Sequence, residues 1–593
     1  MKNKWTFFAM AMMSFVIVAT AADSVKPEVG GISVPSNVGR DAAKETAKQD
    51  RNDVEGVEVD RSLPEVKRVE TPEERDARMA WWREARFGVM LTWGVHSIPA
   101  EGEWYLRAKK MPVAEYKKFS RQFNPVRYSP QEWVSLFKEA GMKYVVLICK
   151  HHDGFALWPS KVTDWTIAGA SPYGKDLVGP LVEACHREGL KFGAYYSHAQ
   201  DWVHRGGATS EANWDPAAQA GDYDAYVNGI AVPQLAELAA YKPDLLWWDT
   251  PVNITKERAD RLMAPLKPLK NLIFNSRLGG GYVGDFAVAE NSIPAYPPSG
   301  DWETCMTLGR KWSYATGDKD FKSPRELVSK LAEVVSKNGN LILGIGPKPD
   351  GTIPGHIVER LKVVGQWLGR NGEAIYGTTG GPFPYLSYGY ATQKKNRLYL
   401  IVLNWPKDGS LRVPVLSDVK SARILGTSDD LVVKKDGQSV TVAVPLQAPD
   451  PIASVVVLEL GGDLVVRPNP TQFATVKASV NGEAAPNILK LRWAAPWLTP
   501  KGTREATLEF TFEKPVVIAS IRLEEPDRWP RIRQDYRIEA AVGGVWKPVA
   551  KGATEGVGAR ADFEPVTTSA LRLTLTGKTG TPGLAKVLFV SPE

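Results

Sequence analysis

Short apolar runs alternate with amphipathic segments over about half of the chain. Between residues 71 and 377, β-type runs such as Tyr144–Cys149, Phe192–Ser197 and Leu245–Asp249 are separated by segments with helical periodicity. One of these segments, Ser129–Gly141, begins with a serine and a proline and ends in glycine, which marks both ends of a helix. Continuous apolar strands separated by helices predict a parallel sheet, and a region of this length suits a (β/α)8-like barrel.

The pattern changes after residue 377. Short β-type runs, such as Arg397–Leu403 and the alternating Ser439–Val444, are broken by Asp-Gly and Pro turns, which is typical of antiparallel sheets. We therefore predict a catalytic α/β domain over 71–377, followed by two all-β sandwich domains over 378–461 and 462–593.

The first 70 residues differ from the rest. Lys2 and Lys4 precede an apolar run that ends in the small residues Ala19–Ala21, the order found in secretory signal peptides. We predict a signal peptide over 1–21 and export to the periplasm or the extracellular space. Residues 22–70 contain no aromatic side chain and are predicted to form a linker or extended arm. The apolar run is too short for a spanning helix, and no membrane association is expected.

Charge and cysteine content exclude several functions. The net charge of +7 over 593 residues is small, whereas nucleic-acid binders carry dense basic surfaces. Cys149, Cys185 and Cys305 have neither zinc-site spacing nor a disulfide pattern. Tryptophan is abundant, with 20 residues in all. Such rings either fill a core or stack on the apolar faces of sugars.

Asp249 is a strong candidate for chemistry. It directly follows the apolar run Leu245–Trp248, and barrel enzymes place their active sites where the strands end. The alternative is a carboxylate that caps the next helix. We favour the functional interpretation because burying a carboxylate without a partner is costly.

Polar and aromatic residues follow other strands too. His151 and His152 could bind a metal, but adjacent strand residues point to opposite faces, so hydrogen bonding to a polyhydroxylated ligand is favoured over metal. Glu103 and Trp104 set a carboxylate beside a ring, and Tyr196 and Trp248 lie near strand ends. This mixture suits a saccharide site.

A retaining glycosidase needs a second carboxylate as general acid and base. Two candidates follow Asp249 in the sequence. Glu290 is expected on a long irregular loop, and Glu303 close to the next strand. Sequence spacing alone does not choose between them.

Taken together, these residues resemble glycoside hydrolase family 29, the retaining α-L-fucosidases. The similarity extends over about 300 residues in the expected order. The matching motifs are Arg86-Phe-Gly-Val, Thr92-Trp-Gly, Gly102-Glu-Trp-Tyr105, Phe123-Asn-Pro, Lys150-His-His-Asp-Gly-Phe155, Trp247-Trp-Asp249, Asn275-Ser-Arg277, Trp302-Glu303, Asn338-Gly-Asn340 and Asn371-Gly-Glu-Ala-Ile-Tyr376.

The resemblance implies a role for each matched residue. Asp249 would be the nucleophile that forms a covalent fucosyl-enzyme, and no cofactor or metal would be needed. The context Gly284-Asp-Phe-x-x-x-Glu290 ranks Glu290 above Glu303 as the acid/base. The residues implied to contact the sugar are Thr92, Trp93, Glu103, Trp104, His151, His152, Tyr196, Trp248 and Arg277.

One position departs from the family pattern. The first strand of the family normally ends in His-Trp-Gly, and this chain has Thr92 in place of the histidine. Recognition of the sugar hydroxyl must then change, use water, or involve another group such as His96. The departure raises the alternative of a glycosidase retuned to a related or substituted sugar.

The C-terminal stretch resembles discoidin-type sugar-binding modules more weakly. The leading hypothesis is an exported, exo-acting α-L-fucosidase that acts on fucosylated oligosaccharides or polysaccharides. A non-catalytic carbohydrate-binding protein on the same barrel is the alternative from another functional class. The presence of Asp249 with two candidate acids, Glu290 and Glu303, weighs against that alternative.

Overall fold

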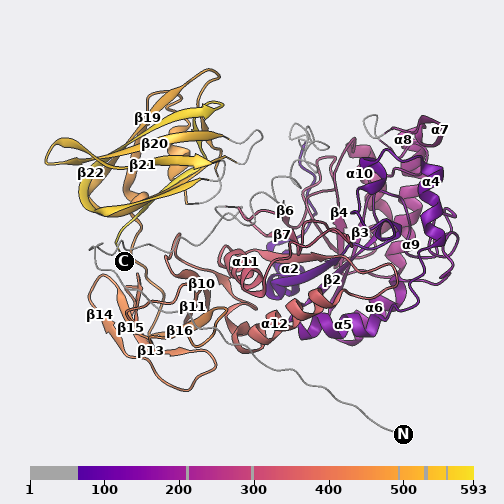
Figure 1. The fold of residues 1–593 in the computed structure, drawn as a ribbon, viewed down its shortest axis with the longest axis horizontal. Coiled ribbons are helices and arrows are strands. Elements are labelled where there is room, and N and C mark those ends of the chain that lie inside the picture. Colours follow the sequence, from indigo (N-terminus) through magenta and orange to yellow (C-terminus); the bar gives the residue numbers. More distant parts are fainter. Residues whose placement is uncertain are drawn as a thin grey trace, which may run out of the picture.

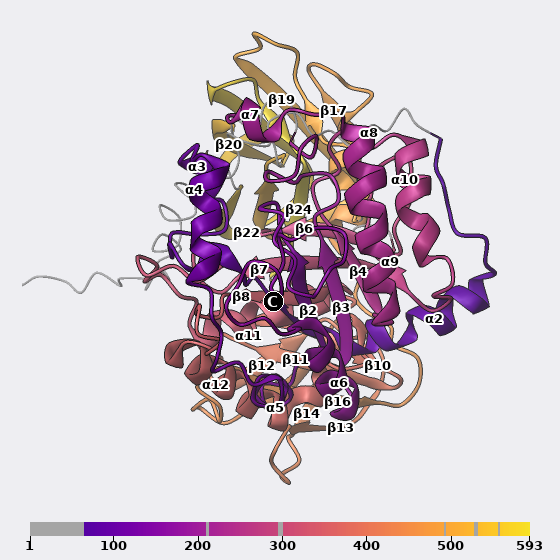
Figure 2. The ribbon, with the colours of Figure 1, turned by 90° about the vertical axis from the view of Figure 1, so that its right-hand side faces the viewer.

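A computed structural model describes residues 64–208, 213–294, 300–491, 494–526, 532–555 and 558–592. Its N-terminal half is a curled sheet of parallel strands surrounded by helices (Figures 1 and 2). The strands are β1 Phe87–Leu91, β2 Tyr144–Lys150, β3 Lys191–Tyr196, β4 Leu245–Trp248, β5 Ile273–Phe274, β6 Ala287–Glu290, β7 Trp302–Thr307 and β8 Asn340–Ile345.

The strands follow the order β5-β4-β3-β2-β1-β8-β7-β6. Every neighbouring pair is parallel. A parallel bridge between Asn275 and Phe286 joins the ends of this order beside β5 and β6. This arrangement confirms the predicted (β/α)8-like fold class.

Helices cover the outside of the sheet, and their ends follow local sequence signals. Ser129 caps α5 by accepting a hydrogen bond from the amide of Glu132, and Ser323 forms a capping box with Glu326 at the start of α11. The helices are α2 Pro72–Ala85, α3 Tyr105–Ala108, α4 Val113–Lys117, α5 Pro130–Glu139, α6 Val178–Arg187, α7 Pro216–Gln219, α8 Tyr223–Tyr226, α9 Val232–Ala240, α10 Lys256–Met263, α11 Pro324–Ser336 and α12 Gly355–Asn371.

Each barrel strand separates two apolar layers. Met90, Tyr195 and Trp247 belong to a cluster inside the barrel, whereas Leu91 and Trp248 belong to the larger cluster beneath the helices. The alternation follows from the pleat of a β-strand, in which successive side chains point to opposite faces. It decides which residues of each strand can face a ligand at the mouth of the barrel.

A β-rich region follows the barrel, as predicted. Its first module has a five-stranded sheet and a three-stranded sheet around one apolar core. The strands of the first sheet are β9 Thr379–Gly380, β10 Gly389–Lys394, β11 Arg397–Val402, β13 Val419–Ile424 and β16 Ser454–Leu460, and those of the second are β12 Ser410–Val413, β14 Val433–Lys435 and β15 Val440–Ala443.

The second β module has its own core and lies to one side of the barrel (Figure 1). Long strands dominate its main sheet. The strands are β17 Ala474–Ala478, β18 Trp497–Leu498, β19 Glu505–Glu524, β20 Arg533–Val542, β21 Val545–Glu555, β22 Ala559–Thr579, β23 Gly583–Leu584 and β24 Lys586–Val590.

The barrel and the first β module share apolar packing. Tyr399 of β11 and Val455 of β16 belong to the same buried cluster as the outer layer of the barrel. The indole nitrogen of Trp367 on α12 donates to the carbonyl of Ala453, with an N···O distance of 2.8 Å. Arg325 at the start of α11 donates to the carbonyl oxygens of Pro451 and Ile452.

The predicted signal peptide and residues 22–63 of the predicted linker lie outside the described residues. The end of the linker contacts the barrel. The amide of Val66 donates to the carbonyl of Gly281 at 2.7 Å, and Arg68 donates to the carbonyl of Leu272 at 2.8 Å. No helix in the described part of the chain is long and apolar enough to span a bilayer.

Candidate active site

Asp249 lies directly after β4, at the end of the barrel where the strands terminate. Its Oδ2 accepts a hydrogen bond from the phenol of Tyr195 at 2.5 Å. Its Oδ1 accepts from the amide of Thr250 at 2.9 Å and from Nη1 of Arg277 at 2.7 Å. All of these partners are donors, and an ionised carboxylate is purely an acceptor. The arrangement therefore suits a charged, oriented carboxylate.

Arg277 connects Asp249 to Glu290. Its second amino group, Nη2, donates to Oε2 of Glu290 at 2.7 Å. Because one guanidinium contacts both carboxylates, the two contacted oxygens lie within roughly 8 Å of each other, a range that includes the roughly 5 to 5.5 Å separation of a retaining pair. Burial opposes the charge of Arg277, but Glu290 and Asp249 outweigh it and raise the pKa of Arg277 above its usual value.

Glu290 is the last residue of β6 and not part of an irregular loop, so that expectation from the sequence is wrong. Its position at the carboxyl end of a barrel strand places it on the same rim as Asp249. The side chain of Glu290 is 41% exposed, and that of Asp249 is 13% exposed. Both carboxylates can therefore be reached from solvent.

Glu303 occupies a different level of the barrel. It is the second residue of β7 and pairs in register with Val288, two positions before Glu290. Its side chain is fully buried and accepts hydrogen bonds from the phenol of Tyr144 at 2.6 Å and the indole of Trp247 at 3.0 Å. Burial raises the pKa of Glu303 to about 7. Glu303 is thus an interior support beneath Trp247.

His151 and His152 do converge, because β2 ends at Lys150 and the chain turns there. Their ring centroids are 4.2 Å apart. His152 contacts the hydroxyl of Ser197 through Nδ1 at 2.6 Å, and its Nε2 lies 3.5 Å from Oδ2 of Asp249. Burial, reinforced by Lys150, lowers the pKa of His152 to about 3. His152 is therefore neutral near neutral pH.

The rings around these histidines complete the site. The ring of His151 stacks on Tyr195 with centroids 6.0 Å apart. Burial and the nearby Asp249 raise the pKa of Tyr195 well above its usual value, so its phenol remains a donor. Trp104 lies 5.3 Å from His152 between ring centroids. Its neighbour Glu103 is buried and accepts a hydrogen bond from the amide of Ser313 at 3.0 Å.

Three residues predicted to contact the sugar face the helices instead, so their placement in the site is wrong. The indole of Trp93 donates to the carbonyl of Lys348, the phenol of Tyr196 donates to Gln234, and Trp248 packs against the ring of His198. All three belong to the outer apolar cluster: Trp93, Tyr196 and Trp248. The cause is the strand alternation, which turns the preceding residue of each pair inward.

The inward residues that sequence reasoning missed are Tyr195 and Trp247. Their rings stack with centroids 5.5 Å apart at an interplanar angle of 15°. The guanidinium of Arg277 lies 5.2 Å from the ring centroid of Trp247, within the range of a cation–π contact. Side chains two positions apart on a strand share a face, so the sequence could have identified Trp247 from its position two residues before Asp249.

Comparison with known proteins supports one family. A sequence profile described as alpha-L-fucosidase matches residues 61–373, which is more than half of the chain. The chain belongs to the alpha-L-fucosidase family. It is therefore a glycoside hydrolase by family. Human tissue alpha-L-fucosidase is 33% identical over 393 residues, which cover 59% of this chain and 82% of the human protein.

Solved structures agree with this assignment. A Bacteroides thetaiotaomicron GH29 alpha-L-fucosidase, trapped as a covalent intermediate by a glutamate-to-glutamine substitution, is 28% identical; the match covers 67% of this chain and 99% of that one, with a TM-score of 0.60. An alpha-L-fucosidase from Vibrio sp. strain EJY3 is 23% identical. The match covers 87% of this chain and 98% of the Vibrio chain, with a TM-score of 0.69. The Vibrio match extends the fold similarity beyond the barrel.

The described part of this family member contains no group of three His, Cys, Asp or Glu side chains that could bind a metal ion. The histidines and carboxylates of the site instead bond to phenol, hydroxyl, amide and guanidinium donors.

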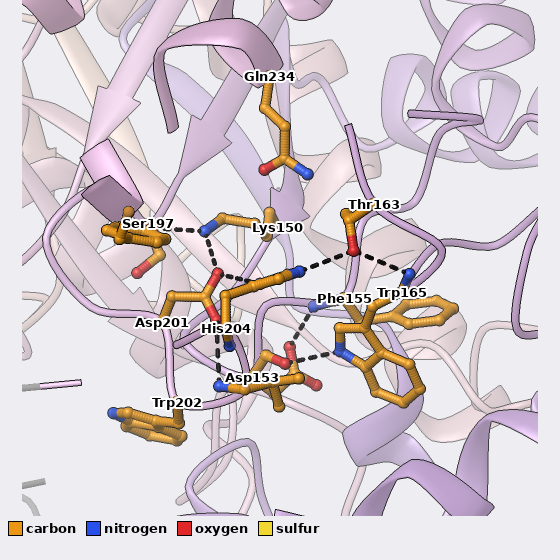
Figure 3. Close-up of polar contacts among 12 residues, drawn as sticks. Lys150, Asp153, Phe155, Thr163, Trp165, Ser197, Asp201, Trp202, His204 and Gln234 are labelled. Carbon is orange, nitrogen blue, oxygen red and sulfur yellow. Dashed lines mark hydrogen bonds and ion pairs between the residues drawn. The ribbon is translucent and has the colours of Figure 1, made fainter. Parts of the chain in front are cut away.

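A buried polar network links the end of β2 to the loop that follows β3 (Figure 3). The ammonium of Lys150 donates to Oδ2 of Asp201 at 2.7 Å and to the phenol of Tyr226 at 2.9 Å. Nδ1 of His204 contacts the same oxygen of Asp201 at 2.8 Å. The amide of Trp202, next to Asp201, donates to the carbonyl of His152 at 2.7 Å. The network thus fixes the backbone of His152.

Charge balance within this network predicts the effect of a substitution. Lys150 and Asp201 are both fully buried. Burial lowers the pKa of Lys150, while His204 and Lys150 outweigh burial at Asp201 and keep its pKa well below its usual value. Lys150→Met removes one partner and should destabilise the fold by roughly 3–5 kcal/mol. Thermal unfolding measures the effect.

The exposed pair Lys138–Glu188 provides the control. Lys138→Met should change stability by less than about 1 kcal/mol, because an ion pair in solvent contributes little. Equal unfolding temperatures for Lys150→Met and Lys138→Met would contradict the structural role of the buried network.

Glu303 predicts a pH dependence of stability. Its pKa is about 7 in the folded protein against 4.5 ordinarily, so folding favours the protonated form. The stability contributed by the neutral acid is complete below about pH 4.5 and is lost as pH rises through about 7. Glu303→Gln stays neutral and should be more stable than the parent above pH 7, by up to roughly 3 kcal/mol. Denaturation at pH 5 and pH 8.5 measures the difference.

Glu290→Gln is the matched control, because it makes the same carboxyl-to-amide change at an exposed side chain. Glu290 ends β6, whereas Glu303 pairs with Val288, two positions before that end. Its stability relative to the parent should not follow the Glu303→Gln pH profile. If Glu303→Gln shows no gain between pH 5 and pH 8.5, Glu303 is not held as the neutral acid.

Proposed function

We propose that this family member is an exo-acting, retaining α-L-fucosidase that removes terminal α-L-fucose from fucosylated oligosaccharides or polysaccharides. The observation that carries the proposal is the shared guanidinium of Arg277, which holds Asp249 and Glu290 on one rim of the barrel. Two carboxylates flanking one point are the functional groups that glycosidic hydrolysis requires.

In the first step Asp249 attacks the anomeric carbon of the fucosyl residue. The bond between that carbon and the leaving-group oxygen breaks, and Glu290 transfers its proton to that oxygen. The product is a covalent fucosyl-enzyme ester. Tyr195 and Arg277 orient the attacking carboxylate through their hydrogen bonds.

In the second step Glu290, now ionised, removes a proton from water. The oxygen of that water attacks the anomeric carbon and the ester bond to Asp249 breaks, which releases fucose and restores both carboxyl groups. The position of Glu290 at a strand end, with 41% of its side chain exposed, suits an acid that must meet both leaving group and water. Glu303, enclosed beneath Trp247, has no such access.

A retuned glycosidase is the second candidate function. Thr92 faces inward at the position where the family carries histidine, and its Oγ1 is buried without a hydrogen-bond partner in the described part of the chain. A changed hydroxyl contact would favour a related or substituted sugar. A purely carbohydrate-binding role is less well supported, because such a role does not require the orientation of Asp249 by three donors.

The experiment uses aryl α-L-fucosides beside a panel of other aryl glycosides. The parent should hydrolyse the fucoside, and Asp249→Ala should abolish turnover. Glu290→Gln should lower kcat/KM by roughly 10²- to 10⁴-fold, the usual contribution of general acid and base catalysis. Glu303→Gln, a matched carboxyl-to-amide change, should leave most activity intact. Activity on another glycoside alone would support the retuned enzyme.

The configuration of the fucosyl azide formed by a variant shows whether the nucleophile or the acid/base has been removed. With Glu290→Ala, azide should intercept the fucosyl-enzyme and give α-fucosyl azide with retained configuration. With Asp249→Ala, azide should attack the substrate directly and give the β product with inverted configuration. Rescue of Glu303→Ala but not Glu290→Ala would overturn the assignment of the acid/base.

Two further proposals concern the ends of the chain. We propose that residues 1–21 direct export, which predicts an exported protein whose first residue is Ala22; an intact N-terminus on that protein would contradict it. We also propose that residues 462–593 form a discoidin-type accessory domain, whose strand topology an experimental structure would test. The region is β-rich with its own core, which supports the second proposal.

A further inference from the structure

A group of buried polar atoms just after the neighbouring strands β1 and β2 has no hydrogen-bond partner in the described part of the chain. The group consists of the hydroxyl of Thr92, both ring nitrogens of His96 and Nδ1 of His151. Thr92 and His96 are at most 1% exposed, and His151 is 6% exposed. A buried polar group left unpaired costs roughly 1–3 kcal/mol. Several in one place indicate a site completed by a ligand.

The group is connected to the nucleophile by ring contacts. His96 lies in a short 3-10 turn, Val95–Ser97, just after β1. Its ring centroid is 5.7 Å from that of His151, and His151 stacks on Tyr195. The phenol of Tyr195 in turn donates to Asp249. Two ring contacts and one hydrogen bond thus connect His96 to Asp249.

The turn holds the imidazole of His96 in one place. The amide and the hydroxyl of Ser97 both donate to the carbonyl of Gly94. A Cβ at Gly94 would lie 3.2 Å from Cε1 of His96, so the glycine leaves room for the ring. Nδ1 of His96 is 3.6 Å from Oδ2 of Asp153, which also accepts from the phenol of Tyr116 at 2.7 Å.

These contacts favour one tautomer of His96. A proton on Nδ1 faces the carboxylate of Asp153 and leaves Nε2 as an acceptor. A sugar hydroxyl is both a donor and an acceptor, so it can donate to Nε2 of His96 and accept from the hydroxyl of Thr92. A carboxylate or a phosphate has no proton for that nitrogen.

We propose that His96 binds a hydroxyl group of the terminal sugar and, with Thr92, determines which sugar the site accepts. This inference rests on the proposed fucosidase function and adds a specificity-determining residue to it. His96 takes over hydrogen bonding from the missing histidine four positions earlier, while Thr92 is short enough to leave space beside it.

Three substitutions and four substrates test the proposal. His96→Leu removes both ring nitrogens, His96→Gln places an amide near the position of Nε2, and His96→Asn places one near Nδ1. Each variant is assayed with an aryl α-L-fucoside and its 2-, 3- and 4-deoxy analogues. His96→Leu should lower kcat/KM on the parent fucoside by roughly 10- to 1000-fold, the range for losing a hydrogen bond in a site built for it.

The deciding result is the pattern across the deoxy analogues. One analogue lacks the hydroxyl that His96 binds, and with it the kcat/KM of the unmodified protein should fall by a similar factor relative to the parent fucoside. His96→Leu should show no further fall in kcat/KM with that analogue, because the hydroxyl and the imidazole are partners. His96→Gln should recover more activity than His96→Asn. Thermal unfolding checks that each variant folds. If a variant does not fold, the deoxy analogues assayed with the unmodified protein still show whether one hydroxyl contributes a factor of this size.

Two outcomes would overturn the proposal, and they are distinguishable. If His96→Leu loses the same factor on the parent fucoside and on every deoxy analogue, His96 acts on the fold or through water and not on a sugar hydroxyl. If the unmodified protein hydrolyses no α-L-fucoside at all, the proposed function fails and this inference fails with it.

Discussion

The barrel strands other than β6 are buried on both faces, and this constraint decides the rest of the site. Successive side chains of a strand belong to different layers, one inside the barrel and one beneath the helices. Tyr195 and Trp247 therefore stack with each other inside the barrel, and their neighbours Tyr196 and Trp248 serve as core. A shift of one residue in either strand would exchange the site for the core.

The same constraint explains what the sequence could and could not predict. Apolar runs and helix caps predicted the barrel and the β-rich region, and the end of a strand singled out Asp249. The assignment of rings failed at Trp93, Tyr196 and Trp248, because two adjacent aromatic residues look alike in a sequence while the pleat separates them by a layer. Strand β6 was missed because its few residues are only partly buried, and Glu290 was therefore placed on a loop.

The polar groups of the site lie at two depths. Arg277 and the two carboxylates that share its guanidinium lie at the rim, where the side chain of Glu290 is 41% exposed. Two further groups lie deeper: His152, whose pKa burial lowers to about 3, and Glu303, whose pKa burial raises to about 7. Desolvation penalises charge with depth, so both pKa values shift towards the neutral form. Lys150 and Asp201 are the exception, and they are buried as a pair.

The core shared by α12 and the first β module gives that module a structural role in the barrel domain. The family profile ends at residue 373, yet Trp367, Tyr399 and Val455 lie in one apolar cluster that continues past this point. The boundary drawn by homology therefore runs through the middle of a packed interior. A truncation at residue 373 would uncover the side of this cluster that Tyr399 and Val455 cover, so the first β module helps to keep the barrel's outer core buried.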